Sequence, residues 1–83
     1  MARTPISLPF NPDRLRVQRE RCGLTQEDLA QRTVDQGTPV ERSTISHLEN
    51  GRRSPLARTL KSLADALGVG IDDLLDKPVG RAS

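Results

Sequence analysis

Signals that begin and end short helices recur along the chain, and they constrain the fold more than any other feature of the sequence. Asn11 followed by Pro12 is a typical helix start, because the Asn side chain accepts hydrogen bonds from free backbone N–H groups and proline suits the first helical position. Gly23 supplies a stop, since glycine readily adopts the left-handed conformation that ends helices. We therefore expect a first helix over residues 11–22.

The next two helices are predicted by the same kind of signal. Thr25 is placed to cap a second helix that continues to residue 33 or 34, and Asp28 completes a capping box. A third helix has residues 43–49 as its interior, with Gly51 just after its end. The second and third helices are consecutive and form a candidate helix pair.

Two alternatives remain open for the segment between the second and third helices, and they differ in where the third helix starts. The eight residues 34–41 separate the conservative ends of the paired helices, whereas a common turn between such helices has roughly three or four. Residues 38–41, TPVE, form a capping box with proline at the first helical position, which predicts a third helix that begins one turn early. Alternatively, the second helix runs on to Gln36. An early start would move Arg42 from the tip of the third helix to its second turn.

A fourth helix and a short fifth one complete the pattern. Ser54 followed by Pro55 is a start signal, and Gly68 is a stop. Residues 71–75 have acidic side chains where the dipole of a short helix favours them, and Pro78 follows. Between the two signals of the fourth helix, apolar residues recur at the spacing of one helix face, at Leu56, Leu60, Leu63, Ala64 and Leu67.

These segments predict an all-α fold, a compact bundle of five short helices in one domain. The chain has 83 residues and Phe10 is its only aromatic residue, so the core must be built from aliphatic side chains, which favours helix packing on helix. We expect the domain over residues 11–77, a flexible arm over residues 1–10 and a tail over residues 78–83.

Composition and charge exclude several classes of protein. The single Cys22 allows no intrachain disulfide and no zinc site, and we expect it to pack as a small core residue in a reducing, cytoplasmic environment. No apolar run approaches the roughly 18 residues that cross a bilayer. Residues 1–61 carry eleven Lys and Arg against seven Asp and Glu, or +4, and residues 62–83 carry two against four, or −2. Positive charge therefore concentrates on the N-terminal part, mostly as Arg, which suits phosphate and guanine edges.

Three segments together resemble a known family. Residues 24–30 read LTQEDLA, residues 43–55 read STISHLENGRRSP, and residues 60–69 read LKSLADALGV. In this order they are similar to the Cro and repressor type of helix-turn-helix proteins, also called XRE. The resemblance implies a lambda-repressor-like domain that binds double-stranded DNA as a transcriptional regulator, a repressor in our interpretation, associated with the nucleoid.

The resemblance also implies roles for individual residues. The third helix would be the reader of base edges, because an α-helix fits the major groove of B-DNA and its first residues point at the bases. Phosphate contacts would flank it at the start of the second helix and just after the third. By matching position, the base contacts fall on Arg42, Ser43, Thr44 and His47, and the phosphate contacts fall on Gln26, Asn50, Arg52 and Arg53.

Two further sets follow from the same resemblance. Arg19 and Glu49 would form a structural ion pair between the first and third helices, and a phosphate contact is the other interpretation of Arg19. The family often pairs through the region after the fourth helix, which here predicts a homodimer on a palindromic operator. The dimer interface is then expected at Ile71, Leu74 and Leu75.

Other interpretations compete with DNA binding. The same fold serves as a protein-interaction module, for example an antitoxin or adaptor, but such a module should show large apolar residues on the outer face of the third helix. His47 alone is more often a solvated polar residue than a ligand, and no second His or Cys accompanies it in a metal pattern. No nucleophile with a base and no Gly-rich phosphate loop is visible. We therefore expect no enzyme activity, no cofactor, no metal and no small-molecule ligand.

Overall fold

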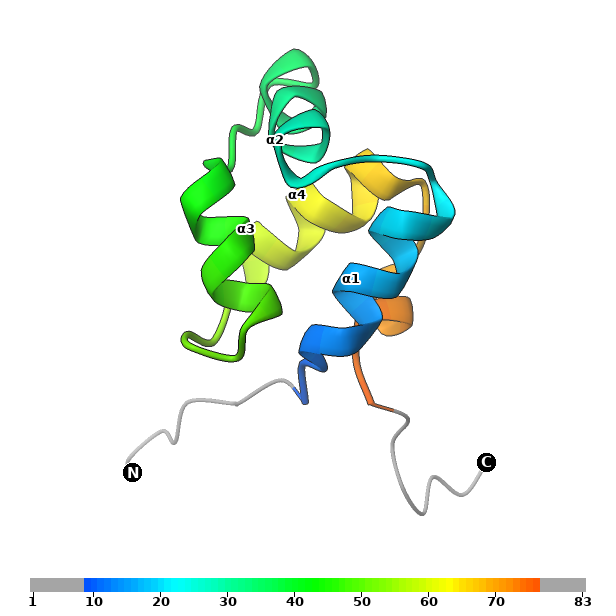
Figure 1. Ribbon diagram of the computed structural model, residues 1–83, viewed down its shortest axis with the longest axis vertical. Helices are drawn as coiled ribbons and strands as arrows, with labels where there is room; N and C mark the ends of the chain where they lie inside the picture. Colours follow the sequence, from blue (N-terminus) through cyan, green and yellow to red (C-terminus); the bar gives the residue numbers. More distant parts are fainter. Residues whose placement is uncertain (1–8, 77–83) are drawn as a thin grey trace, which may run out of the picture.

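The computed structural model describes residues 9–76 (Figure 1). These residues form four α-helices and one short 3-10 helix. The β-pairing among them is limited to a single isolated bridge. The all-α prediction is therefore right, but the fifth helix is only a four-residue 3-10 turn. In chain order the elements are α1 (Pro12–Arg21), α2 (Gln26–Asp35), α3 (Arg42–Glu49), α4 (Ala57–Leu67) and η1 (Ile71–Leu74). The expected tail, residues 78–83, and most of the expected arm lie outside the described residues.

The predicted caps of the first two helices are confirmed. The Asn11 side chain accepts from the backbone N–H groups of Asp13 at 2.9 Å and of Arg14 at 3.4 Å. Thr25 and Asp28 form the reciprocal capping box, with both bonds at 3.0 Å. The bond from the Thr25 N–H holds the pKa of the Asp28 carboxyl below its ordinary value. These local bonds fix where α1 and α2 begin.

The core is aliphatic and is formed by side chains from all five elements. In Figure 1, α4 runs through the middle of the molecule, between α3 on one side and α1 on the other. None of the helices in this described part has the length and apolar character needed to cross a bilayer. The buried apolar residues are Leu15, Leu29, Val40, Ile45, Leu48, Leu60, Leu63, Ala64, Ala66, Leu67 and Leu74.

Two predicted core positions are wrong. Leu56 is 58% exposed, because α4 begins only at Ala57 and the extended Leu56 precedes its first turn instead of lying on the apolar stripe. Cys22 is exposed as well, since it follows the last residue of α1, and its thiol meets the Leu67 carbonyl oxygen at 3.6 Å. The remaining stripe residues of α4 are buried as predicted.

The connection between α2 and α3 decides between the two open starts. Helix α2 extends to Asp35 with Gln36 as its C-cap, and α3 begins at Arg42. The early start at Thr38 is therefore wrong. Val40 is instead buried in the core, and the Thr38 hydroxyl bonds to Ser62 of α4 at 2.8 Å, so neither residue is free to form a helical turn. Arg42 stays at the tip of α3.

The two ends of the described chain are joined. Phe10 and Leu75 form an isolated antiparallel bridge, and the Asp76 N–H donates to the Pro9 carbonyl at 2.7 Å. The Asn11 side chain also donates to Asp76 Oδ1 at 2.7 Å. The expected arm over residues 1–10 is thus too long by two residues, because Pro9 and Phe10 belong to the folded domain.

Candidate nucleic-acid interface

Helix α3 lies along one edge of the molecule (Figure 1), and its side chains that are not buried are polar. Ile45 and Leu48, three positions apart, are completely buried and hold the helix on the core. The opposite side carries hydrogen-bonding groups and no large apolar residue. Arg42 and Ser43 are exposed there, and Thr44, Ser46 and His47 are half-buried.

A buried ion pair fixes α3 against α1. Arg19 Nε donates to Glu49 Oε2 at 2.7 Å and Arg19 Nη2 donates to Oε1 at 2.9 Å, so the contact is bidentate. The two side chains are only 12% and 4% exposed. The hydrogen bond to Glu49 raises the pKa of Arg19 above its ordinary value. Because these donors bond to protein acceptors, Arg19 has a structural role. This geometry does not support the other interpretation of Arg19, as a phosphate contact.

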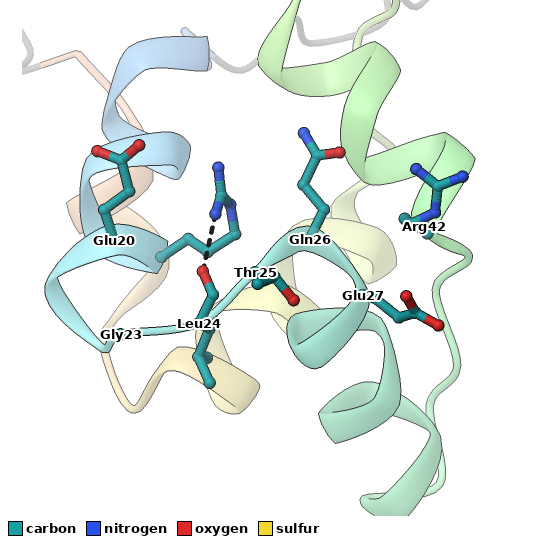
Figure 2. A pocket seen from close by; sticks show the side chains of 8 residues that line it. Glu20, Gly23, Leu24, Thr25, Gln26, Glu27 and Arg42 are labelled. Carbon is teal, nitrogen blue, oxygen red and sulfur yellow. Dashed lines mark hydrogen bonds between the residues drawn. The ribbon is translucent and has the colours of Figure 1, made fainter.

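The same network joins the N-terminus of α2 to the C-terminus of α3. Gln26 Nε2 donates to Glu49 Oε1 at 3.1 Å, and Arg19 Nη1 donates to the Leu24 carbonyl oxygen at 2.7 Å, the bond drawn dashed in Figure 2. Glu49 therefore receives bonds from both neighbouring helices. Gln26 has a fixed position at the tip of α2, and its Nε2 carries a second N–H besides the one bonded to Glu49.

An open hollow of about 730 Å³ is lined by the end of α1, the connection from α1 to α2 and the tips of α2 and α3. Figure 2 shows Gln26 and Arg42 on its border, one from α2 and one from α3, with the Glu27 carboxylate beside them. Sequence reasoning missed the acidic residues Glu20 and Glu27 at this hollow. Their signal in the sequence is weak, because exposed acidic residues on helices are ordinary: Glu20 lies in the last turn of α1 and Glu27 in the first turn of α2. They place negative charge near the residues expected to contact DNA.

The other end of α3 carries a second group of donors. Asn50 is the C-cap of α3 and is exposed, and Gly51 follows with a φ of 72°. The Arg52 N–H donates to the His47 carbonyl at 2.9 Å, which closes the helix end. Arg52 and Arg53 are exposed and line a hollow of about 300 Å³ beside Pro12, the first residue of α1. Polar donors therefore stand at both ends of the outward face of α3.

The residues expected at the dimer interface do not share one environment. Leu74 is completely buried in the core of the single chain, so its assignment to an interface is wrong. The reason is the tight 3-10 turn of η1, which directs Leu74 inward. Ile71 and Leu75 are half-buried and packed against the core at its surface.

Comparison with known proteins matches this arrangement of helices. A family model described as a helix-turn-helix domain matches residues 13–77. The chain belongs to this helix-turn-helix family, in its XRE-type branch. The HTH-type transcriptional regulator DdrOP3 of Deinococcus deserti is 36% identical over 64 residues, which cover 77% of this chain and 46% of that protein. The chain thus spans about half the length of this relative.

A solved structure is similar as well. The restriction-modification controller protein C.AhdI from Aeromonas hydrophila superposes with a TM-score of 0.68 at 31% identity, over 77% of this chain and 89% of that one. Within the helix-turn-helix of the present chain, α2 and α3 are the paired helices. Six residues, 36–41, connect them, whereas a common turn has roughly three or four.

Proposed function

We propose that this helix-turn-helix domain binds double-stranded DNA in a sequence-specific manner and acts as a transcriptional regulator, with α3 in the major groove. The observation that carries the proposal is the outward face of α3, which is polar along its length and flanked by donors at both ends. The names of DdrOP3 and of the controller protein C.AhdI support the same class of function. A protein-docking helix would need apolar side chains on this face, and α3 presents Arg42, Ser43 and His47.

The dimensions of α3 suit the groove. An α-helix with its side chains is about 10–12 Å in diameter, and the major groove is about 12 Å wide. In this proposal Arg42 and Ser43, at the tip of α3, contact the bases first. Thr44 in the same turn and His47 in the next turn make the remaining base contacts. Gln26, Asn50, Arg52 and Arg53 hold phosphates on either side of the groove. These phosphate contacts set register and affinity, and the base contacts set sequence preference.

The proposal includes a two-fold dimer that represses transcription from a palindromic operator. One module of this size buries roughly 600–1,000 Å² on DNA, which favours two copies on half-sites about one helical turn apart. The surface after α4 is the proposed interface, with Ile71 and Leu75 as its apolar contacts. Next to them, Val69 and Lys61 line a groove of about 340 Å³ between α4 and η1.

Replacing Arg42 tests the base contacts. We expect selection from a random duplex pool to enrich a palindrome, and Arg42→Ala to reduce the preference for it over scrambled DNA by about 10- to 100-fold, since a bidentate contact to guanine contributes about 1–3 kcal/mol. Arg52→Ala is the matched control. It should weaken binding to all sequences alike and reduce the slope of log affinity against log salt by about 0.9. Failure to enrich any sequence would overturn the proposed function in favour of a protein partner.

Replacing Ile71 tests the dimer. Light scattering of the full chain should give twice the mass of one chain, free and on the palindrome, and Ile71→Ser should shift the free protein toward the mass of one chain. Val17→Ser is the control, because Val17 is an exposed apolar residue of α1 and is not part of the proposed interface after α4. A single-chain mass at high protein concentration and on palindromic DNA would contradict the dimer.

A further inference from the structure

Besides the Arg19–Glu49 ion pair, two polar residues are buried in the described part of the chain, and both contact the segment that leads into α3. They are Thr33 of α2, which is completely buried, and Ser62 of α4, which is 3% exposed. Apart from that ion pair, the other buried residues of this part are aliphatic. Burying a hydroxyl costs free energy unless it forms hydrogen bonds. The hydrogen-bond partners of Thr33 and Ser62 therefore indicate the structural role of these residues.

Thr33 holds the backbone two residues before α3. Its Oγ1 accepts from the Val40 N–H at 2.8 Å and donates to the Ala30 carbonyl at 2.6 Å. The Thr38 N–H donates to the Thr33 carbonyl at 3.0 Å, so the backbone of this residue holds the connection as well. The connection is therefore fixed to α2 by the side chain and the carbonyl of Thr33, and the Val40 side chain is itself buried.

Ser62 holds the same connection to α4. Its hydroxyl donates to the Thr38 carbonyl and lies 2.8 Å from the Thr38 hydroxyl. Gln36 Nε2 donates to Thr38 Oγ1 at 2.9 Å and to the Ser62 carbonyl at 2.8 Å. One proton assignment satisfies all of these atoms: Ser62 donates to the Thr38 carbonyl, Thr38 donates to Ser62, and the two amide protons of Gln36 go to Thr38 and to the Ser62 carbonyl.

We propose that Thr33 and Ser62 are positioning residues for DNA recognition, which set the placement of the tip of α3 relative to α2 by anchoring residues 36–41. This inference rests on the proposed function. The connection is longer than a common helix-turn-helix turn, and a longer segment leaves more freedom between the two helices unless it is anchored. Base readout depends on where Arg42 and Ser43 stand, whereas phosphate contacts from flexible Arg side chains tolerate small shifts.

Removing either hydroxyl should therefore reduce discrimination between sequences more than affinity for DNA in general. We expect Thr33→Val and Ser62→Ala each to lower the ratio of affinities for the selected and scrambled duplexes by about tenfold. Affinity for scrambled DNA and the salt slope should stay near those of the wild type. Thr33→Ser, which keeps the hydroxyl, should retain the wild-type ratio.

The control separates positioning from loss of stability. Ala66→Gly weakens α4 one turn after Ser62 without touching the connection, and it should lower the melting temperature while leaving the affinity ratio unchanged. Should Ser62→Ala not fold, Gln36→Ala removes an exposed member of the same network, and we expect it to lower the ratio about threefold. Amide NMR shifts of Thr33→Val without DNA should change in residues 40–47 more than in α1.

The outcomes are distinguishable. A wild type that prefers no sequence would overturn the proposed function and this inference with it. A wild type with a clear preference that all three network variants retain would overturn this inference alone. Parallel loss of affinity for both duplexes, as in a partly unfolded protein, would also overturn it.

Discussion

Glu49→Ala should lower the free energy of unfolding by about 3–5 kcal/mol, because it leaves the Arg19 guanidinium buried without its carboxylate. The same substitution removes the acceptor of Gln26, so the tip of α2 loses its bond to α3 as well. Urea unfolding, monitored by circular dichroism, measures this change in the free energy of unfolding. The loss is large for a domain of this size, because native domains are stable by only about 5–15 kcal/mol.

A surface pair supplies the control for this prediction. Lys61 and Asp65 of α4 lie 3.1 Å apart, but their side chains are 65% and 50% exposed. Asp65→Ala should therefore change the free energy of unfolding by less than about 1 kcal/mol. A change for Glu49→Ala as small as that of Asp65→Ala would show that Arg19 is well solvated in the unpaired protein, contrary to the burial described above.

Leu74→Ala should destabilise the domain by about 2–5 kcal/mol, since it opens a cavity in a completely buried site where η1 packs on α1 and α4. The half-buried neighbour Leu75 is the matched control, and Leu75→Ala should have a clearly smaller effect on unfolding. Thermal unfolding of the two variants beside the wild type measures the difference. If Leu74→Ala weakened self-association and left stability intact, its sequence-based assignment to the interface would be restored.

The helix starts at Asn11 and Thr25 could be predicted from sequence because their determinants are local. Each cap bonds to backbone groups two or three residues away, so the pattern of residue types contains the whole interaction. The polar face of α3 was predictable for a similar reason, since Ile45 and Leu48 mark the opposite, buried face.

The start of α3 could not be settled from sequence because distant residues decide it. Residues 38–41 have a good local signal for a helical turn, but Ser62, 24 positions along from Thr38, competes for the Thr38 hydroxyl and carbonyl. Burial of Val40 adds a second tertiary contact. Local capping propensity is worth about 1 kcal/mol, and several buried contacts exceed it.

The inward direction of Leu74 was missed for a different reason. The spacing of Ile71, Leu74 and Leu75 suits one face of an α-helix, but η1 is a 3-10 turn and Leu75 follows it in an extended conformation. The side chains of Leu74 and Leu75 therefore separate, one into the core and one toward the surface. Periodicity over five residues does not distinguish these two backbones.

The bridge between Phe10 and Leu75 gives the domain adjoining attachment points. Paired residues of an antiparallel bridge have Cα atoms about 5 Å apart, so the polypeptide enters and leaves the folded unit at nearly one place. Such a unit is suited to insertion into a surface loop of an unrelated host protein, because the two ends of the loop can join it without distortion of the host or of the inserted domain. A pull applied to the two junctions would load the Phe10–Leu75 bridge and the Asn11–Asp76 bond before it reached α3.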